Sequence, residues 1–312
     1  MRSVIRLRCY LSPKLLRSTF FVRNEAVTLI QGRNSLDVLD RIVSTKIIDM
    51  PDLTRRDALF CDSNGRIYDM ATIYTITGNV LLSSSISGKE TTRRKLVDGT
   101  SWDEDCEVLV ADNAIFRISI FPSDLSAVKE LFGVDLEETG ADDLIENDDQ
   151  LFVKIDTAFG SMIDLLVKYE NYEKITSLLR DSEFEEMDSK SWDNFRIMLG
   201  IREMCDIQGN LPDEMGLGGL VSNDKGCYPG QEIHARLESS GRKIKSICRI
   251  NGDSPLNLGK QQTPEFGTIS ITSAGLFNGQ AFALALIRLG NSNAEKIQIQ
   301  GNDYSIEIMG HP

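Results

Sequence analysis

Residues 241–312 alternate short apolar runs with turns rich in glycine and asparagine, a pattern that restricts them to antiparallel β-structure. Strands are expected at Lys243–Ile250, Gly267–Ser273, Gln280–Leu289, Lys296–Gln300 and Tyr304–Ile308. Short strands at this spacing are typical of a small antiparallel barrel or sandwich. We therefore expect a C-terminal β-barrel over residues 241–312, beginning at the boundary near Ser239-Ser240-Gly241.

The body of the chain, residues 24–240, mixes strands with helices. Val27–Ile30 predicts a strand, and Ser35 is a suitable N-cap for the helix that follows it. Asp62-Ser63-Asn64-Gly65 and Thr77-Gly78-Asn79 predict turns between antiparallel strands, because asparagine and glycine tolerate positive φ. Further helices are expected at residues 88–97, 123–133 (capped by Ser123), 171–180 and 191–199. The predicted fold class is α+β.

Residues 1–23 differ from the rest in charge. They carry six bases and no acid, with serine and threonine between the bases. This composition is typical of a mitochondrial transit peptide. We expect cleavage between about Phe20 and Arg23 and residence in the mitochondrial matrix. The alternative is a disordered basic tail that carries no address.

The remaining 289 residues carry 28 bases and 47 acids, a net charge of −19. This balance argues against nucleic-acid binding and against docking on anionic membranes, since both require clustered cations. Membrane insertion is not expected either, because the apolar run Ala281–Ile287 is far shorter than the ~20 residues of a spanning helix. The acidic stretch from Asp135 to Asp149 contains no base and is interpreted as solvated surface.

The six cysteines include no CxxC pair, and the chain has only two histidines. A zinc site with paired cysteines and a multi-histidine metal site are therefore excluded. Cysteines in a reducing compartment are expected to be free thiols.

One segment combines several residues that carry chemistry: Lys225-Gly226-Cys227-Tyr228-Pro229-Gly230-Gln231-Glu232, followed by His234 and Arg236. Pro229 and Gly230 suit the two central positions of a type II turn. Gly226 adds a second permissive position, so Cys227 is expected on a constrained loop. Lys225 and Arg236 would favour its thiolate form if they fold close to it. The alternative is a structural turn with a buried, inert thiol.

Residues 225–232 resemble the K-G-C-Y-x-G-Q-E signature of a folate-binding family related to the aminomethyltransferase, or T-protein, of the glycine cleavage system. The signature is carried by YgfZ-like proteins and their mitochondrial iron–sulfur assembly counterparts. Arg236 matches an arginine that follows the signature. The resemblance extends over most of residues 25–240 and includes Arg196, Gly200, Glu203, Pro212 and Glu214.

The resemblance implies a T-protein-like fold and an assembly factor for [4Fe-4S] proteins, with A-type scaffold proteins and apo client proteins as partners. Because such a cluster takes about four cysteine ligands, Cys227 is expected to supply one ligand of a cluster that is shared transiently with a partner. Tetrahydrofolate is the second implied ligand. The resemblance makes these the site residues that hold the loop or contact a ligand: Lys225, Gly226, Cys227, Tyr228, Pro229, Gly230, Gln231, Glu232 and Arg236.

Two other functions stay open. The first is that of a true aminomethyltransferase or another folate-dependent one-carbon enzyme, although T-proteins lack the Cys-Tyr-x-Gly-Gln-Glu string. Alternatively, the chain is an interaction protein whose thiol is incidental. His234, at a position that is usually apolar or threonine in the family, either pairs with Cys227 in catalysis or simply packs. Asn223 and the glycine-rich segment 215–220 also depart from the family pattern, and Glu203 is a weak candidate for the pterin.

Overall fold

The computed structural model describes residues 17–157, 160–241, 243–289 and 294–310. The predicted α+β class is confirmed, with mixed helices and three sheets that are antiparallel except where β1 pairs in parallel with β11. The chain divides into two compact units that are discontinuous in sequence. Unit 1 contains the chain up to Val38, Ile47–Asp57 and Ala71–Ser189, and unit 2 contains Leu39–Lys46, Ala58–Met70 and the chain from Lys190. The predicted domain boundary near residue 240 falls inside unit 2.

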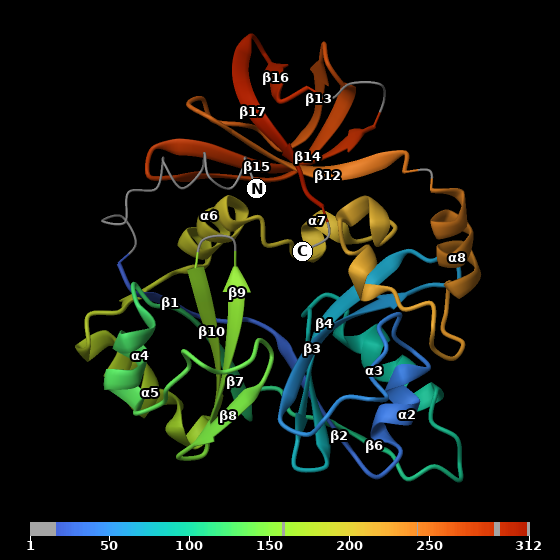
Figure 1. Cartoon of the computed structure of the whole chain (residues 1–312), viewed down its shortest axis with the longest axis vertical. Helices are drawn as coiled ribbons and strands as arrows, with labels where there is room; N and C mark the ends of the chain where they lie inside the picture. The colour runs from blue at the N-terminus through green and yellow to red at the C-terminus, as the bar shows by residue number, and fades with distance from the viewer. Residues whose placement is uncertain (1–16, 158–159, 242, 290–293, 311–312) are drawn as a thin grey trace. The chain divides into compact units, whose positions relative to one another are not determined.

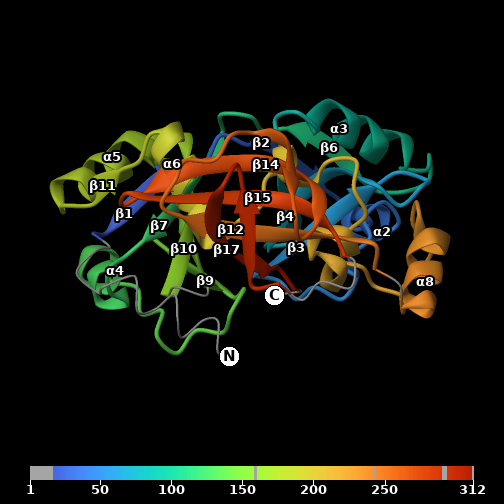
Figure 2. The same ribbon diagram turned by 90° about the horizontal axis from the view of Figure 1, so that it is seen from above.

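The first sheet of unit 1 has the strand order β11-β1-β7-β10-β9-β8. Helices α4 (Leu125–Phe132) and α5 (Tyr169–Asp181) pack against it through Val128, Ile175 and Leu179, which join the buried strand residues in one apolar core. Figure 2 shows α5 beside β11. The strands are β1 (Thr19–Val22), β7 (Ile115–Phe121), β8 (Leu144–Asn147), β9 (Gln150–Thr157), β10 (Gly160–Lys168) and β11 (Glu185–Glu186).

The second sheet has the order β3-β4-β5-β2-β6, with α2 (Ser35–Asp40) and α3 (Lys89–Asp98) in the connections. Its strands are β2 (Ala26–Gln31), β3 (Thr54–Cys61), β4 (Ile67–Ile76), β5 (Asn79–Ser84) and β6 (Glu107–Val110). The hairpin turn predicted between β3 and β4 is confirmed: Gly65 has a φ of 71°, and the Asp62 carboxylate accepts the N–H groups of Asn64 and Arg66.

The two sheets of unit 1 share a small apolar cluster. Tyr74 and Leu81 of the second sheet belong to it together with Val153 and Leu166 of the first. Polar side chains from β7, β10 and β4 meet in the same unit and form the charged cluster described below. The packing of two sheets therefore buries both an apolar patch and several charges.

Unit 2 contains a six-stranded antiparallel sheet with the order β13-β14-β15-β12-β17-β16. The sheet curls into a half-barrel (Figure 1), so the predicted C-terminal barrel is confirmed in that form. Its strands are β12 (Lys245–Gly252), β13 (Gly259–Thr263), β14 (Gly267–Phe277), β15 (Gln280–Arg288), β16 (Lys296–Ile299) and β17 (Asn302–Ile308). Unit 2 also contains α6 (Ser189–Leu199), α7 (Met204–Ile207), the 3₁₀ turns η2 (Asp213–Met215) and η3 (Gly218–Leu220), and α8 (Gln231–Ser240).

Three details differ from the sequence prediction. Asp124, not Ser123, caps α4, because its carboxylate accepts the N–H of Ser126. Strand β13 was not predicted, since its residues are mostly polar and exposed. Strand β1 lies within the segment predicted as a transit peptide, and its Phe20 is fully buried. A transit peptide that leaves this sheet intact has to end before Thr19; residues 1–16 lie outside the described chain.

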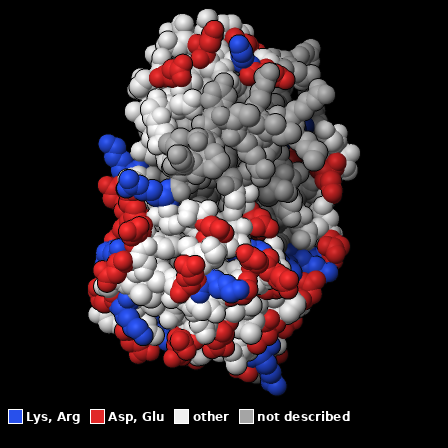
Figure 3. All heavy atoms as spheres, turned by 60° about the vertical axis from the view of Figure 1, so that its left-hand side comes forward, with Lys and Arg blue, Asp and Glu red and all other residues white. Residues whose placement is uncertain are grey.

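No helix among the described residues is long and apolar enough to cross a membrane. Figure 3 shows one face of the molecule, where acidic side chains are interspersed with basic ones among the residues drawn in colour.

Candidate functional site

The sequence motif lies in unit 2, on the loop that follows η3 and leads into α8. Cys227 is exposed at this loop. The alternative of a buried thiol in a structural turn is therefore wrong for this residue.

Lys225 anchors one side of the loop. Its side chain is 1% exposed, and its ammonium lies 3.2 Å from the Asp40 carboxylate. The same Nζ donates to the carbonyl of Asp40 and to the carbonyls of Val43 (3.0 Å) and Thr45 (2.9 Å). Burial lowers the pKa of Lys225, although Asp40 opposes this shift. Of the roles predicted for Lys225, these contacts support that of holding the loop, because its donors face the chain itself.

Gly230 anchors the other side. Its φ of 86° and ψ of 1° are those of the third residue of a type II turn, and Gln231 N–H closes the turn on the Tyr228 carbonyl at 3.3 Å. A Cβ at residue 230 would lie 2.5 Å from the Cα of Gly65. Gly226, in contrast, has open space around it and lies outside the left-handed region. Only one of the two motif glycines is therefore required by the backbone.

Tyr228 and His234 also hold the loop that carries Cys227. Both are buried, and the Tyr228 hydroxyl lies 3.2 Å from His234 Nδ1. His234 Nε2 lies 2.8 Å from the carbonyl of Gly65. Because a carbonyl only accepts, Nε2 carries the proton and Nδ1 accepts from the tyrosine. Burial lowers the pKa of His234, which keeps the ring neutral. Both ring nitrogens thus serve packing, the role favoured over a catalytic pair with Cys227.

The other motif residues lie on α8. Glu232 and Arg236 are exposed and Gln231 is half-buried. Within the described part of the chain, no hydrogen bond or ion pair is formed by the side chains of these three residues. Their predicted role as ligand or partner contacts stays a prediction.

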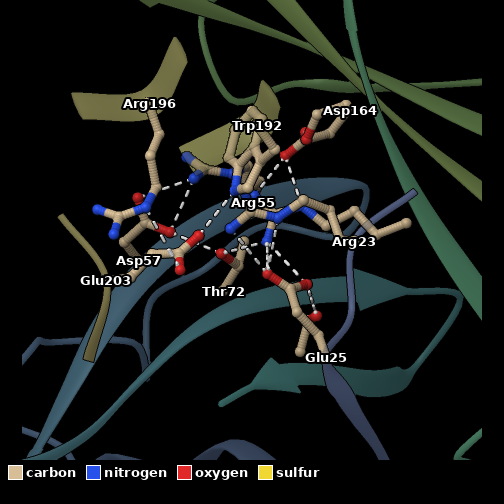
Figure 4. A network of polar contacts seen from close by, with 12 residues as sticks. Arg23, Glu25, Arg55, Asp57, Thr72, Asp164, Trp192, Arg196 and Glu203 are labelled. Carbon is tan, nitrogen blue, oxygen red and sulfur yellow. Dashed lines mark hydrogen bonds and ion pairs between the residues drawn. The ribbon is translucent and has the colours of Figure 1, made fainter. Parts of the chain in front are cut away.

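A buried charged cluster lies in unit 1, where sequence reasoning did not identify a site. Arg117 of β7 bonds to the carboxylate of Asp164 on β10 and to Glu25, and its third partner is the Thr72 hydroxyl. Figure 4 labels Glu25, from the connection between β1 and β2, together with Thr72 of β4 and Asp164 of β10. Burial alone would raise the pKa of Glu25, but Arg117 and Arg23 lower it to about 2. The signal in the sequence is a charged residue within each of two otherwise apolar strands, 115–121 and 161–167.

Two buried donors in this part of unit 1 have no hydrogen-bond partner among the described residues. Arg55 bonds through its terminal nitrogens to Asp57 and Asp142, but its Nε is buried without a hydrogen bond. The hydroxyl of Tyr74, which is 0% exposed, also has no partner. Burial raises the pKa of Tyr74, so the hydroxyl keeps its proton. Buried donors of this kind normally have an acceptor, and these two can serve an acceptor from outside the chain.

A second polar cluster lies in unit 2, around Arg196 of α6. Its guanidinium donates to Asp206 (2.9 Å) and to Ser273 (3.0 Å), both buried. Trp192 donates to the Glu203 carboxylate at 2.9 Å, and Glu203 also caps α7. Figure 4 labels Trp192, Arg196 and Glu203 of this cluster. The two family positions Arg196 and Glu203 therefore have clear structural roles.

Arg202 and Cys205 lie beside this cluster. The Nε of Arg202 is buried without a partner, and burial lowers the pKa of this arginine to about 10. Cys205 is a second exposed thiol, 3.4 Å from an Arg196 nitrogen, and sequence reasoning did not single it out. Among the residues that the structure describes, no three His, Cys, Asp or Glu side chains gather in a group that could hold a metal ion.

Comparison with known proteins identifies the fold. No protein-family model and no curated protein matches the sequence. The crystal structure of glycine cleavage system aminomethyltransferase T from Bartonella henselae matches with a TM-score of 0.80 and 13% identity, over 99% of this chain and 88% of that one. Heterotetrameric sarcosine oxidase from Corynebacterium sp. U-96 matches over 53% of this chain and 83% of that one at 13% identity, with a TM-score of 0.40. The predicted T-protein-like fold is confirmed: the chain has the fold of an aminomethyltransferase of the glycine cleavage system.

Proposed function

We propose that this protein is a tetrahydrofolate-binding assembly factor for [4Fe-4S] proteins, in which Cys227 donates one ligand to a cluster shared with a partner. The observation that carries the proposal is an exposed thiol on a loop braced from both sides. A buried cysteine could not reach a partner's cluster, and a cysteine on a loose loop would have to be ordered on binding. Cys227 is already exposed, and its loop is already held in place.

The cluster is cargo in this account. Iron–sulfur clusters are usually held by about four thiolates, so Cys227 would supply one and an A-type scaffold or an apo client protein the others. Glu232 and Arg236 lie on α8, which follows the thiol in the sequence, and these exposed side chains would contact that partner. The resemblance of residues 225–232 to the assembly branch supports this choice over other uses of the fold.

Tetrahydrofolate fits the donors left free in unit 1. Its glutamate tail and pterin carbonyl are acceptors, and the Arg55 Nε and the Tyr74 hydroxyl are buried donors without a partner. Bound tetrahydrofolate supplies a carrier for one-carbon units. The residues of this chain would bind and orient it.

Tyr74→Phe tests the folate part, because it removes a hydroxyl that has no hydrogen-bond partner among the described residues. Anaerobic titration calorimetry should show that the wild type binds tetrahydrofolate. Since one hydrogen bond contributes about 1 kcal/mol, the variant should bind about 5- to 10-fold more weakly at unchanged stability. Tyr169→Phe, at an exposed tyrosine, is the control. No binding by the wild type, or equal affinity of the two variants, contradicts this part of the proposal.

A folate-dependent aminomethyltransferase is the second candidate, and the match to aminomethyltransferase T favours it. A glycine-cleavage assay with the remaining components of that system separates the two. We expect no turnover above the background without this protein. Robust turnover would replace the assembly role with an enzymatic one.

The partner and the compartment are tested in cells. We expect the full chain to localise to mitochondria and an A-type scaffold to co-purify with it anaerobically, less so with Cys227→Ala. Deletion of residues 1–16 should abolish import. Cytosolic localisation of the full chain contradicts the matrix assignment, and retention of the scaffold by Cys227→Ala contradicts the cluster-sharing role.

A further inference from the structure

A second surface lies in unit 1, at the open edge of strand β6. This strand pairs with β2 alone among the described residues, and the sheet ends there. The register pairs Thr28 with Val110 and Ile30 with Val108. The N–H of Ala111 donates to the carbonyl of Val27 at 2.9 Å.

That hydrogen bond fixes which backbone groups face outward. Hydrogen-bonded pairs alternate with non-bonded pairs along an antiparallel ladder. Residues 107, 109 and 111 therefore bond to β2. The N–H and C=O groups of Val108 and Val110 point to the open edge, where a further strand could bond to them.

Apolar side chains of β6 and of the segments that precede it in the sequence are exposed. Trp102, in the loop that leads into β6, is 97% exposed, and Val110 is 68% exposed. Val97, at the end of α3, is 57% exposed, and α3 packs against β6. Tryptophan contributes more than most residues to protein interfaces when it becomes buried, so full exposure at an open sheet edge indicates a contact surface.

The charge around the edge indicates which kind of partner could bind there. From Asp98 to Glu107 the chain has five carboxylates and no base. Asp103 and Glu107 are exposed, and the exposed Asp105 forms an ion pair with Arg33 at 3.8 Å. A second copy of this edge would bring like charges together, and nucleic acid would be repelled as well.

We propose that β6 is a docking edge for an extended basic segment of a partner protein, which adds to the sheet as a strand and covers Trp102. The segment alternates Lys or Arg with apolar residues. Its backbone bonds to Val108 and Val110, its cations face Asp103 and Glu107, and one of them stacks on the Trp102 ring. This surface is separate in sequence from the Cys227 loop.

The test uses the full chain and an eight-residue peptide that alternates Lys and Val, with binding followed by fluorescence anisotropy at physiological salt. Reversal of two edge charges, Asp103→Lys with Glu107→Lys, should weaken binding about tenfold. The control pair Glu130→Lys with Glu138→Lys changes the net charge equally at exposed positions elsewhere in unit 1, and screening should keep its effect below about twofold. Trp102→Ala should also weaken binding.

Hydrogen exchange supplies the readout specific to strand addition. The amides of Val108 and Val110 should exchange rapidly in the free protein and become protected by the peptide. The same peptide N-methylated at every second residue should not bind, because it cannot complete the ladder. Equal weakening by both charge-reversal pairs, unchanged exchange at Val108 and Val110, or absence of binding would overturn the proposal.

Discussion

Lys225 shows how a residue expected near a ligand can serve the fold instead. The sequence places a lysine two residues before an exposed cysteine, which suggested an electrostatic role. In the structure its ammonium is buried against three carbonyls and one carboxylate. The motif could be found from the sequence, but burial of this amine depends on residues about 180 positions away, which no local pattern reveals.

Lys225→Met should therefore destabilise the protein strongly. It removes the hydrogen bonds of a charged donor and takes the Lys225 ammonium away from the Asp40 carboxylate, which is 11% exposed. We expect a loss of about 3 kcal/mol in the free energy of unfolding, measured by urea denaturation. The control is Lys243→Met, whose partner Asp213 is 3.8 Å away and half exposed, and its loss should stay below about 1 kcal/mol. Equal losses in the two variants contradict the anchoring role.

His234 makes stability depend on pH in a defined direction. Its pKa is lowered by burial, so the unfolded chain binds the proton more readily than the folded one. The contribution of the neutral ring to stability is therefore complete above 6.5, the ordinary pKa of histidine, and is lost as the pH falls below it. His234→Gln cannot titrate but can still bond to Tyr228 and Gly65.

Unfolding by urea at pH 7 and pH 5 measures this effect. The wild type should lose more stability between these values than His234→Gln, because the carboxylates titrate equally in both. Glu25 titrates lower, since its pKa of about 2 places its loss of stability between pH 4.5 and 2. A wild type and variant with the same pH dependence would exclude protonation of His234 as a source of instability.

At the level of elements, turn chemistry was the most reliable guide. Asn64-Gly65 and Pro229-Gly230 predicted a hairpin and a type II turn, and both formed as expected. Such turns are specified by φ preferences of a few residues, so they can be predicted without knowledge of the fold. Strand β1 could not be predicted in this way. Its apolar residues follow a basic segment that is typical of a transit peptide, and its partner strands β7 and β11 are distant in sequence.

The two glycines of the motif loop give a matched test of this reasoning. Gly230→Ala forces a left-handed φ on a residue with a Cβ and places that Cβ against Gly65, so it should cost about 2 kcal/mol or more. Gly226→Ala meets nothing within 4 Å and should change stability by less than about 0.5 kcal/mol. Thermal and urea unfolding of both variants decide the point. A destabilised Gly226→Ala with a stable Gly230→Ala would refute the assignment of the turn.

For the whole molecule, charge and fold act at different ranges. The net charge of −13 disfavours nucleic acid as a partner and attracts basic surfaces, including the segment proposed for β6. The aminomethyltransferase fold is shown by the match to aminomethyltransferase T. Several charged residues of the buried cluster in unit 1 had no predicted role, because Arg117 meets Asp164 only through the pairing of β7 with β10 and meets Thr72 only where the second sheet packs against the first. The proposed assembly function, in contrast, rests on Cys227 and the loop that carries it.

Cluster sharing by Cys227 is tested most directly by anaerobic reconstitution with an A-type scaffold. The protein and the scaffold are mixed with iron and sulfide, and the cluster is followed by absorption and Mössbauer spectroscopy and by transfer to an apo [4Fe-4S] protein. We predict a [4Fe-4S] cluster on the mixture that Cys227→Ala loses and Cys205→Ala, which removes the second exposed thiol, retains. Cluster spectra and transfer that are unchanged in Cys227→Ala would contradict the account.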